Sequence, residues 1–181
     1  MNRLYFDFDG TVAEFRKGVS PNVYAKEGYS RTLKPYVNVV EGIKILTERN
    51  ILEPCVISAV MPYKYVIDDK NWWLDEYLPT IPVSRRYYVE YGTDKSVAMK
   101  KQFGARPGDI FLDDYNPNLF DVKNKLPGVL PVKLVNDINN GSGEWHGAMV
   151  HAASDPEEIA LTLYGLMLAN QTRLTNKNER G

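Results

Sequence analysis

The sequence predicts a three-layer α/β/α fold, in which a parallel sheet lies between two layers of helices. Two observations carry this prediction: short apolar runs recur along the chain, and segments with helical apolar spacing separate them. Strands that alternate with helices in this way form parallel sheets covered on both faces. A chain of 181 residues suits one domain. We expect this domain to span residues 1–170, followed by a polar, frayed tail at 171–181.

The first half of the chain contains two of the expected strands and two helices. A run of apolar and aromatic residues predicts a buried strand at 4–8. Apolar residues recur at helical spacing over 37–46 and predict a helix. A second buried strand follows at 54–58. Pro62 then opens another helix, whose polar side, including Asp69, is expected to face water.

The second half continues the alternation. Residues 80–91 hold one or two short strands, and a helix is expected over 93–103, capped by its Thr residue and ended by Gly. Buried strands follow at 110–112 and 129–135. The last helix begins after a capping box that starts at Ser154.

Composition excludes several classes of protein. The chain carries 22 basic and 23 acidic residues, so its net charge of -1 gives no overall attraction for nucleic acid or membrane. The single cysteine, Cys55, excludes an intrachain disulfide and a cysteine-based metal site. No apolar run approaches the ~18 residues that a membrane span needs. We therefore expect a cytoplasmic protein without a membrane partner.

In such sheets, ligands bind outside the carboxyl ends of the strands. In this sequence, polar residues follow the predicted strands at these ends. Two carboxylates one residue apart at a strand end cannot both enter the core, and their crowding favours a bound cation. Oxygen ligands suit Mg²⁺. A lysine in the first turn of a helix would add positive charge for a phosphate. The residues that converge in this way are Asp7, Asp9, Ser58, Lys95, Asp113 and Asp114.

These residues resemble, in order and spacing, the four motifs of the haloacid dehalogenase (HAD) superfamily of phosphatases. The motifs are Asp7-Phe8-Asp9-Gly10-Thr11, then Ser58 after an apolar strand, then Lys95, and then Asp113-Asp114. The resemblance covers about residues 3–135. It implies a Rossmann-like HAD fold with a central first strand and the sheet order 3-2-1-4-5.

The resemblance also implies a role for each residue. Asp7 would be the nucleophile that forms an aspartyl-phosphate, and Asp9 would protonate the leaving oxygen and then deprotonate water. Mg²⁺ would be held by Asp7, by the main-chain carbonyl of Asp9 and by Asp113. Asp114 would orient a metal-bound water, and Thr11 would support the site from outside the metal ligands. The phosphate would be bound by Ser58, Ala59 and Lys95.

The substrate is less constrained by the sequence. Only a short lid, at about 12–34, fits between Thr11 and the helix near Pro35, so the cap is minimal. We expect a short lid or an open cleft. An open cleft would suit a large substrate, or it would be closed by a lid from the second subunit of a homodimer. Candidate substrate contacts are Arg16, Arg31, Trp145 and His146, which mix basic and aromatic groups suited to an anionic ligand with a flat ring. The alternative for these residues is an ordinary solvated lid and a glycine-rich connector.

A second resemblance concerns the substrate. The segments Met61-Pro62-Tyr63-Lys64 and Leu112-Asp113-Asp114-Tyr115-Asn116 are similar to the 5'(3')-deoxyribonucleotidase branch, although that branch has a larger helical cap. The expected function is hydrolysis of a small phosphorylated metabolite, with a nucleoside monophosphate 5'-nucleotidase as one candidate. Two alternatives stay open: a phosphatase for nucleic-acid ends or phosphoproteins, and a non-catalytic phosphate-binding regulatory module.

Overall fold

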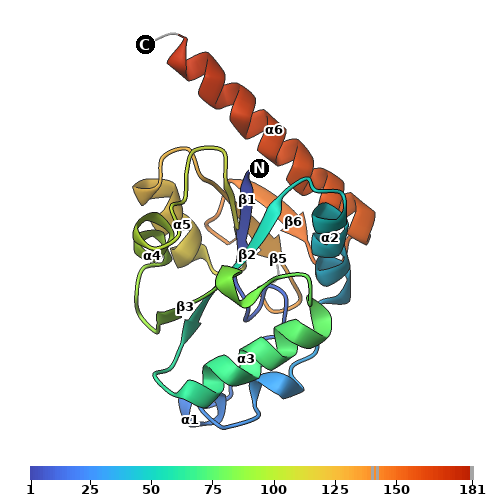
Figure 1. The fold of residues 1–181 in the computed structure, drawn as a ribbon, viewed down its shortest axis with the longest axis vertical. Coiled ribbons are helices and arrows are strands. Elements are labelled where there is room, and N and C mark those ends of the chain that lie inside the picture. The colour runs from blue at the N-terminus through green and yellow to red at the C-terminus, as the bar shows by residue number, and fades with distance from the viewer. Residues whose placement is uncertain (140, 142, 180–181) are drawn as a thin grey trace.

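The computed structural model describes residues 1–139, 141 and 143–179. Its α/β architecture consists of one parallel sheet flanked by helices, consistent with a Rossmann-like fold (Figure 1). The sheet order is β3-β2-β1-β4-β5-β6. The predicted order 3-2-1-4-5 is therefore present, and a sixth strand that the sequence analysis missed extends the sheet beyond β5. Across the described residues, no helix combines the length and apolar character that a membrane span requires.

All strand pairs in the sheet are parallel. Leu4 pairs with Pro54 on one side and with Ile110 on the other, which places β1 at the centre. Parallel strands all end on one side of the sheet, which we call the carboxyl edge. The strands are β1 (Arg3–Phe6), β2 (Glu53–Val60), β3 (Arg86–Glu90), β4 (Ile110–Asp113), β5 (Leu130–Val135) and β6 (Ala148–His151).

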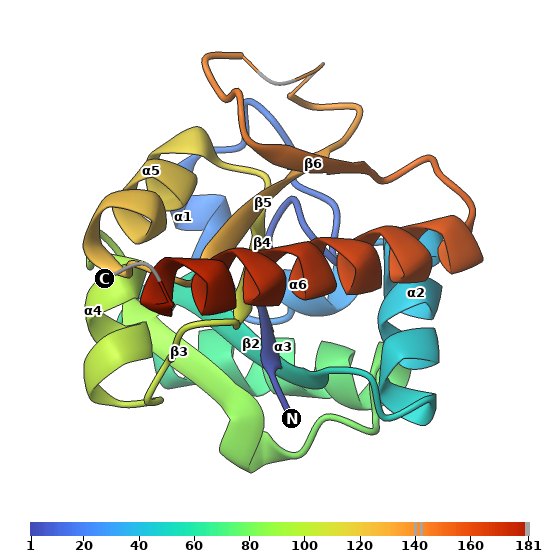
Figure 2. The ribbon, with the colours of Figure 1, turned by 90° about the horizontal axis from the view of Figure 1, so that it is seen from above.

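The two faces of the sheet form separate apolar cores. Successive side chains of a strand point to opposite faces, so Leu4 and Phe6 join one core and Tyr5 joins the other. The first core is covered by α2 (Val37–Glu48), α3 (Lys64–Tyr77) and α6 (Pro156–Asn178), and the second by α4 (Lys95–Lys101) and α5 (Asn116–Lys125). Figure 2 shows α4 and α5 on one side of the view and α2 on the other, with α6 running across from the α2 side.

The lid region at 12–34 contains α1 (Pro21–Tyr24) and the short 3₁₀ helix η1 (Ser30–Thr32). In Figure 1 it lies with α3 at the lower end of the molecule, toward which the strands run. The carboxylate of Asp69 on α3 accepts hydrogen bonds from the Gly28 backbone N–H at 2.5 Å and from Arg31 Nε at 2.6 Å. The indole of Trp73 donates to the Leu33 carbonyl at 2.8 Å. The lid is therefore tied to α3.

Several expectations about the elements are corrected. Asp69, expected to face water, is buried because it pairs with the lid. The tail expected to fray from residue 171 continues α6 as far as Asn178, and Asn170 anchors this part of the helix by donating to the Gly128 carbonyl at 2.9 Å. The cap of α6 is Asp155 and not Ser154, because the Asp155 carboxylate accepts the Glu157 backbone N–H at 2.9 Å.

The unpredicted elements of the sheet and its helical layers are α5 and β6. Helix α5 buries only Leu119 and Val122, so its apolar pattern is weak. Strand β6 is four residues long. In the 80–91 region, a 3₁₀ helix, η2 (Val83–Arg85), precedes the single strand β3.

Candidate active site

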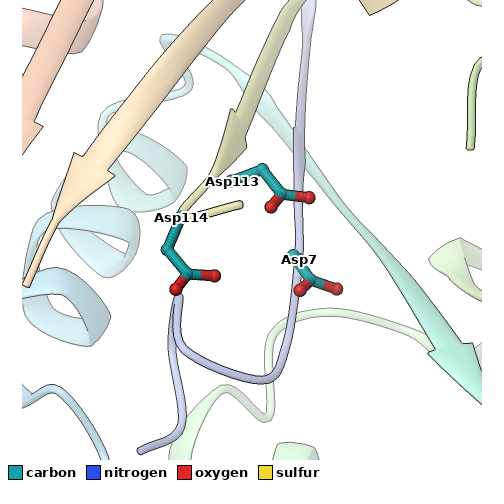
Figure 3. Close-up of side chains that lie close together, drawn as sticks. All are labelled: Asp7, Asp113 and Asp114. Atoms are coloured by element: carbon teal, nitrogen blue, oxygen red, sulfur yellow. The ribbon is translucent and has the colours of Figure 1, made fainter. Parts of the chain in front are cut away.

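Three carboxylates meet at the carboxyl edge of the two central strands (Figure 3). Asp7 directly follows β1, and Asp113 ends β4 with Asp114 next to it. A hydrogen bond of 3.0 Å from the Asp7 backbone N–H to the Leu112 carbonyl keeps the two strand ends side by side. Carboxylate oxygens of Asp7, Asp113 and Asp114 lie within 4.8 Å of one another, in a geometry that could hold a metal ion. The predicted convergence of these residues is confirmed.

The turn after Asp7 packs tightly against Asp114. Gly10 has a φ of +78°, and a Cβ at this position would lie 2.5 Å from an oxygen of the Asp114 carboxylate. Asn136, which follows β5, donates to the Gly10 carbonyl at 2.7 Å. Only glycine combines this left-handed backbone with so close an approach. Gly10 and Asn136 therefore determine where Asp114 sits.

A buried lysine joins two of the carboxylates. Lys95, the first residue of α4, places Nζ 2.6 Å from an Asp7 oxygen and 2.8 Å from an Asp113 oxygen. The start of α4 is fixed by Asp121, which accepts from the backbone N–H and the hydroxyl of Ser96 at 3.0 and 2.9 Å. Burial by itself would lower the pKa of Lys95, but the carboxylates of Asp113 and Asp7 outweigh it and raise the pKa. Lys95 is therefore held as a cation.

Crowding and burial leave the carboxylate cluster short of positive charge. Burial, followed by the charges of Asp113 and Asp7, raises the pKa of Asp114 to about 8. Burial also raises the pKa of Asp113 to about 6, although Lys95 opposes the shift. Asp114 therefore holds a proton at neutral pH, and Asp113 holds one below about pH 6, and both would lose these protons beside a divalent cation.

A second cluster forms around Lys70 of α3, a residue that the sequence analysis missed. The residue is 3% exposed. Its ammonium forms an ion pair with Oδ2 of Asp9 and donates to Ser58 Oγ at 2.7 Å. The ammonium also lies 4.6 Å from the centre of the Phe8 ring. Lys70 therefore connects two predicted site residues, Asp9 and Ser58.

Lys133 and Asn118 were also missed, and both support the cluster of carboxylates. The buried ammonium of Lys133 donates to the Asp114 carbonyl at 2.9 Å and to Asn116 Oδ1 at 2.6 Å. Burial lowers the pKa of Lys133. The amide of Asn118 donates to Asp113 Oδ2 at 2.9 Å. In the sequence, Lys133 interrupts the apolar run of the strand predicted at 129–135, and this is the signal that could have marked it.

Other predicted residues at the carboxyl edge take the following places. Ala59 is half-buried, and its carbonyl lies 3.4 Å from Ser58 Oγ and 3.5 Å from Lys70 Nζ. Thr11 is fully buried, and its hydroxyl has no hydrogen-bond partner within the part of the chain that the structure describes. The side chain of Asp9 pairs with Lys70 and is not part of the carboxylate cluster.

The predicted substrate contacts are not brought to the carboxylates. Arg16 binds Glu14 and the Thr32 carbonyl, and Arg31 binds Asp69. Both arginines already serve to hold the lid. Their guanidinium groups are committed to contacts within the chain.

Trp145 and His146 precede β6, whose parallel direction puts its first residue on the side opposite the carboxyl edge. Trp145 is buried, packs edge-on against Phe120 at 5.4 Å, and donates to the Ala148 carbonyl at 3.0 Å. His146 is exposed. The loop begins at the carboxyl edge but returns across the sheet before these two residues, which explains the difference from the prediction.

Comparisons with known proteins give no assignment. No protein-family model matches the chain, and no curated protein matches it. The residues of the site therefore carry the functional proposal on their own.

Proposed function

We propose that this protein is a magnesium-dependent phosphomonoester hydrolase in which Asp7 is the nucleophile. The observation that carries the proposal is the meeting of Asp7, Asp113 and Asp114 within 4.8 Å, with the ammonium of Lys95 against two of them. The resemblance to HAD phosphatases supports the same assignment. A buried nucleophile beside a cation and an acidic cluster suits attack on a phosphate more than an ordinary structural ion pair.

The residues present fit a divalent cation. The Asp7 Oδ1 atom is buried and, within the described residues, makes no hydrogen bond beyond its ion pair with Lys95. The side chains of Asp7 and Asp113, with the Asp9 main-chain carbonyl, would hold Mg²⁺, and Asp114 is close enough to join them or to orient a coordinated water. When bound, the ion would neutralise phosphate charge and orient the ester.

The reaction would use two carboxylates in turn. A carboxylate oxygen of Asp7 attacks phosphorus, the bond to the leaving oxygen breaks, and Asp9 protonates that oxygen. Asp9 then takes a proton from water, which attacks the aspartyl-phosphate, releases phosphate and restores Asp7. Lys95 offsets the charge of Asp7 throughout, and Ser58 with Ala59 lies where a phosphate oxygen would be bound.

A small phosphorylated metabolite is the proposed substrate class, with a nucleoside monophosphate as one candidate. The ends of three strands carry exposed tyrosines that could contact a flat ring: Tyr63 follows β2, Tyr91 follows β3 and Tyr115 follows β4, with 47%, 75% and 60% exposure. The short lid leaves a second candidate, the phosphorylated end of a nucleic acid, whose bases would stack on these rings.

The first test is release of phosphate from p-nitrophenyl phosphate with Mg²⁺ or with EDTA. Asp7→Asn is expected to abolish turnover, and the exposed control Asp68→Asn on α3 is expected to retain it. Activity that persists in Asp7→Asn, or that EDTA leaves unchanged, would contradict the proposal. Mononucleotides and 5'-phosphorylated oligonucleotides compared in the same assay would separate the two substrate candidates.

A further inference from the structure

Lys70 occupies a position where the fold alone calls for an apolar side chain. On α3 it lies four residues after Val66 and three and four residues before Trp73 and Leu74, all of which are buried. These spacings put the four side chains on one face of the helix. The sequence therefore places a lysine on the core-facing stripe of α3.

Burying this ammonium is costly for folding. A buried charge loses hydration, and its ion pair often contributes no more stability than an apolar side chain of the same size. Lys70 is 3% exposed, whereas the side chain of its partner Asp9 is 27% exposed at the edge of the site. A costly buried cation that reaches toward a partly open carboxylate points to a role in chemistry.

The surroundings hold the Lys70 side chain in place. The preceding residue, Asp69, binds the lid through Gly28 and Arg31, and Trp73 binds the Leu33 carbonyl one turn later. The ammonium lies 4.6 Å from the centre of the Phe8 ring. Because α3 is anchored on both sides of position 70, the ammonium is delivered to a fixed point between Asp9 and Ser58.

We propose that Lys70 is a positioning residue that orients Asp9 for proton transfer and Ser58 for phosphate binding. This inference rests on the proposed function. The ion pair engages Oδ2 of Asp9, so the other carboxylate oxygen faces the leaving group and exchanges the proton. Ser58 Oγ accepts a hydrogen bond from Lys70 at 2.7 Å and donates to the Ala59 carbonyl at a longer distance of 3.4 Å. A phosphate oxygen would replace this long contact as the acceptor of the single hydroxyl proton.

The proton balance of the first step makes this role measurable. When Asp7 attacks, the leaving oxygen keeps the electron pair of the broken P–O bond. An alkyl oxygen also needs the proton from Asp9, whereas a nitrophenyl oxygen is stable as an anion and leaves without it. Misplacing Asp9 therefore slows hydrolysis of alkyl esters more than that of aryl esters.

The experiment compares Lys70→Met, Lys70→Arg and the control Lys101→Met, an exposed lysine at the end of α4. The assay measures kcat and KM for p-nitrophenyl phosphate and for 2-glycerophosphate with saturating Mg²⁺ over a range of pH. Lys70→Met is expected to lower kcat/KM for the alkyl ester by ~10–100-fold, part of the contribution of a general acid. The comparison uses kcat/KM because this ratio reports the steps up to departure of the leaving group, whereas kcat also contains hydrolysis of the aspartyl-phosphate that both esters share. Its loss on the aryl ester is expected to be at least about tenfold smaller, because aryl departure needs no proton.

Two further readouts separate positioning from a merely structural role. Lys70→Arg keeps a cation near Asp9 and is expected to fall between wild type and Lys70→Met in its ratio of alkyl to aryl kcat/KM. Thermal unfolding of Lys70→Met is expected to stay near wild type, because methionine fills the apolar stripe and Asp9 reaches solvent. Lys101→Met is expected to match wild type in every readout.

The failures are distinguishable. Wild-type activity with an equal loss of kcat/KM on both esters in Lys70→Met overturns the role of Lys70 and leaves the proposed function standing. A wild type that hydrolyses neither ester overturns the proposed function and the role of Lys70 together. If Lys70→Met does not fold, the ratio in Lys70→Arg decides: a lowered alkyl-to-aryl ratio supports positioning, and an unchanged ratio overturns it.

Discussion

Removing divalent cations should make the stability of this protein fall as the pH rises. The pKa of Asp114 is raised from its ordinary value of 3.8 to about 8, and that of Asp113 to about 6. Between these limits the folded chain holds protons that the unfolded chain has lost, so the free energy of unfolding decreases with pH. Lys95, whose pKa is raised, stays protonated in both states across this range and adds no slope.

The size of the effect follows from the number of protons. One carboxyl group that is protonated only in the folded state gives a slope of ~1.4 kcal/mol per pH unit. Between pH 6 and 8 only Asp114 of these two carboxylates contributes, and for a chain of this size its slope corresponds to a fall in Tm of roughly 3–6 °C per pH unit. Below pH 6 Asp113 steepens the slope. Mg²⁺ at about 100 times its Kd would restore ~2.7 kcal/mol, and more at pH 8 than at pH 5, because protons compete for the same oxygens.

The measurement is thermal unfolding from pH 5 to 8, in EDTA and in Mg²⁺, for wild type, Asp114→Asn and the exposed control Asp68→Asn. Asp114→Asn is expected to flatten the slope in EDTA above pH 6 and to reduce the gain from Mg²⁺. Asp68→Asn is expected to behave as wild type. A Tm in EDTA that is constant or rises from pH 6 to 8, or an equal slope in Asp114→Asn, would refute the reasoning.

Two other substitutions test the geometry around the site. Gly10→Ala puts a Cβ 2.5 Å from the Asp114 carboxylate at a φ of +78°. We therefore expect thermal unfolding to show a loss of ~1–3 kcal/mol in unfolding free energy and a weaker stabilisation by Mg²⁺. A variant as stable and as responsive to Mg²⁺ as wild type would contradict the close approach. Trp145→Phe loses the hydrogen bond to the Ala148 carbonyl and is expected to cost ~1 kcal/mol of stability. Its KM is expected to equal that of wild type. A raised KM would indicate that Trp145 contacts the substrate.

The carboxyl edge was predictable because parallel strands impose it. Once strands were expected at 4–8 and 110–112, the residues after them had to meet on one side of the sheet, and the structure places Asp7 beside Asp113. The burial of Lys70 could have been read from its spacing to Val66 and Leu74, but its neighbours Asp68 and Asp69 suggested a solvated helix face. Its partners could not be predicted, because the sequence does not show that α3 docks beside Asp9 and Ser58.

The prediction for Trp145 failed for a topological reason. The strand before it ends at the carboxyl edge, so the loop that follows starts there and was assigned to the site. Because β6 is parallel to β5, the chain must cross back before β6 begins. Trp145 therefore packs near the start of β5, where it lines a hollow with Val129 and Leu130. Without knowledge of β6 the direction of this loop could not be known.

The two aspartates of the first motif are served by lysines from opposite faces of the sheet. Lys95 reaches Asp7 from α4, which covers one apolar core, and Lys70 reaches Asp9 from α3, which covers the other. Each lysine offsets one carboxylate, so the repulsion between Asp7 and Asp9 is relieved within the chain. Lys95 contacts Asp7 and Asp113, and among the described residues no lysine ammonium contacts the Asp114 carboxylate. Under the proposed function, a divalent cation would therefore lie on the Asp113 side of Asp7, and Lys70 would control proton transfer by Asp9 from the opposite side.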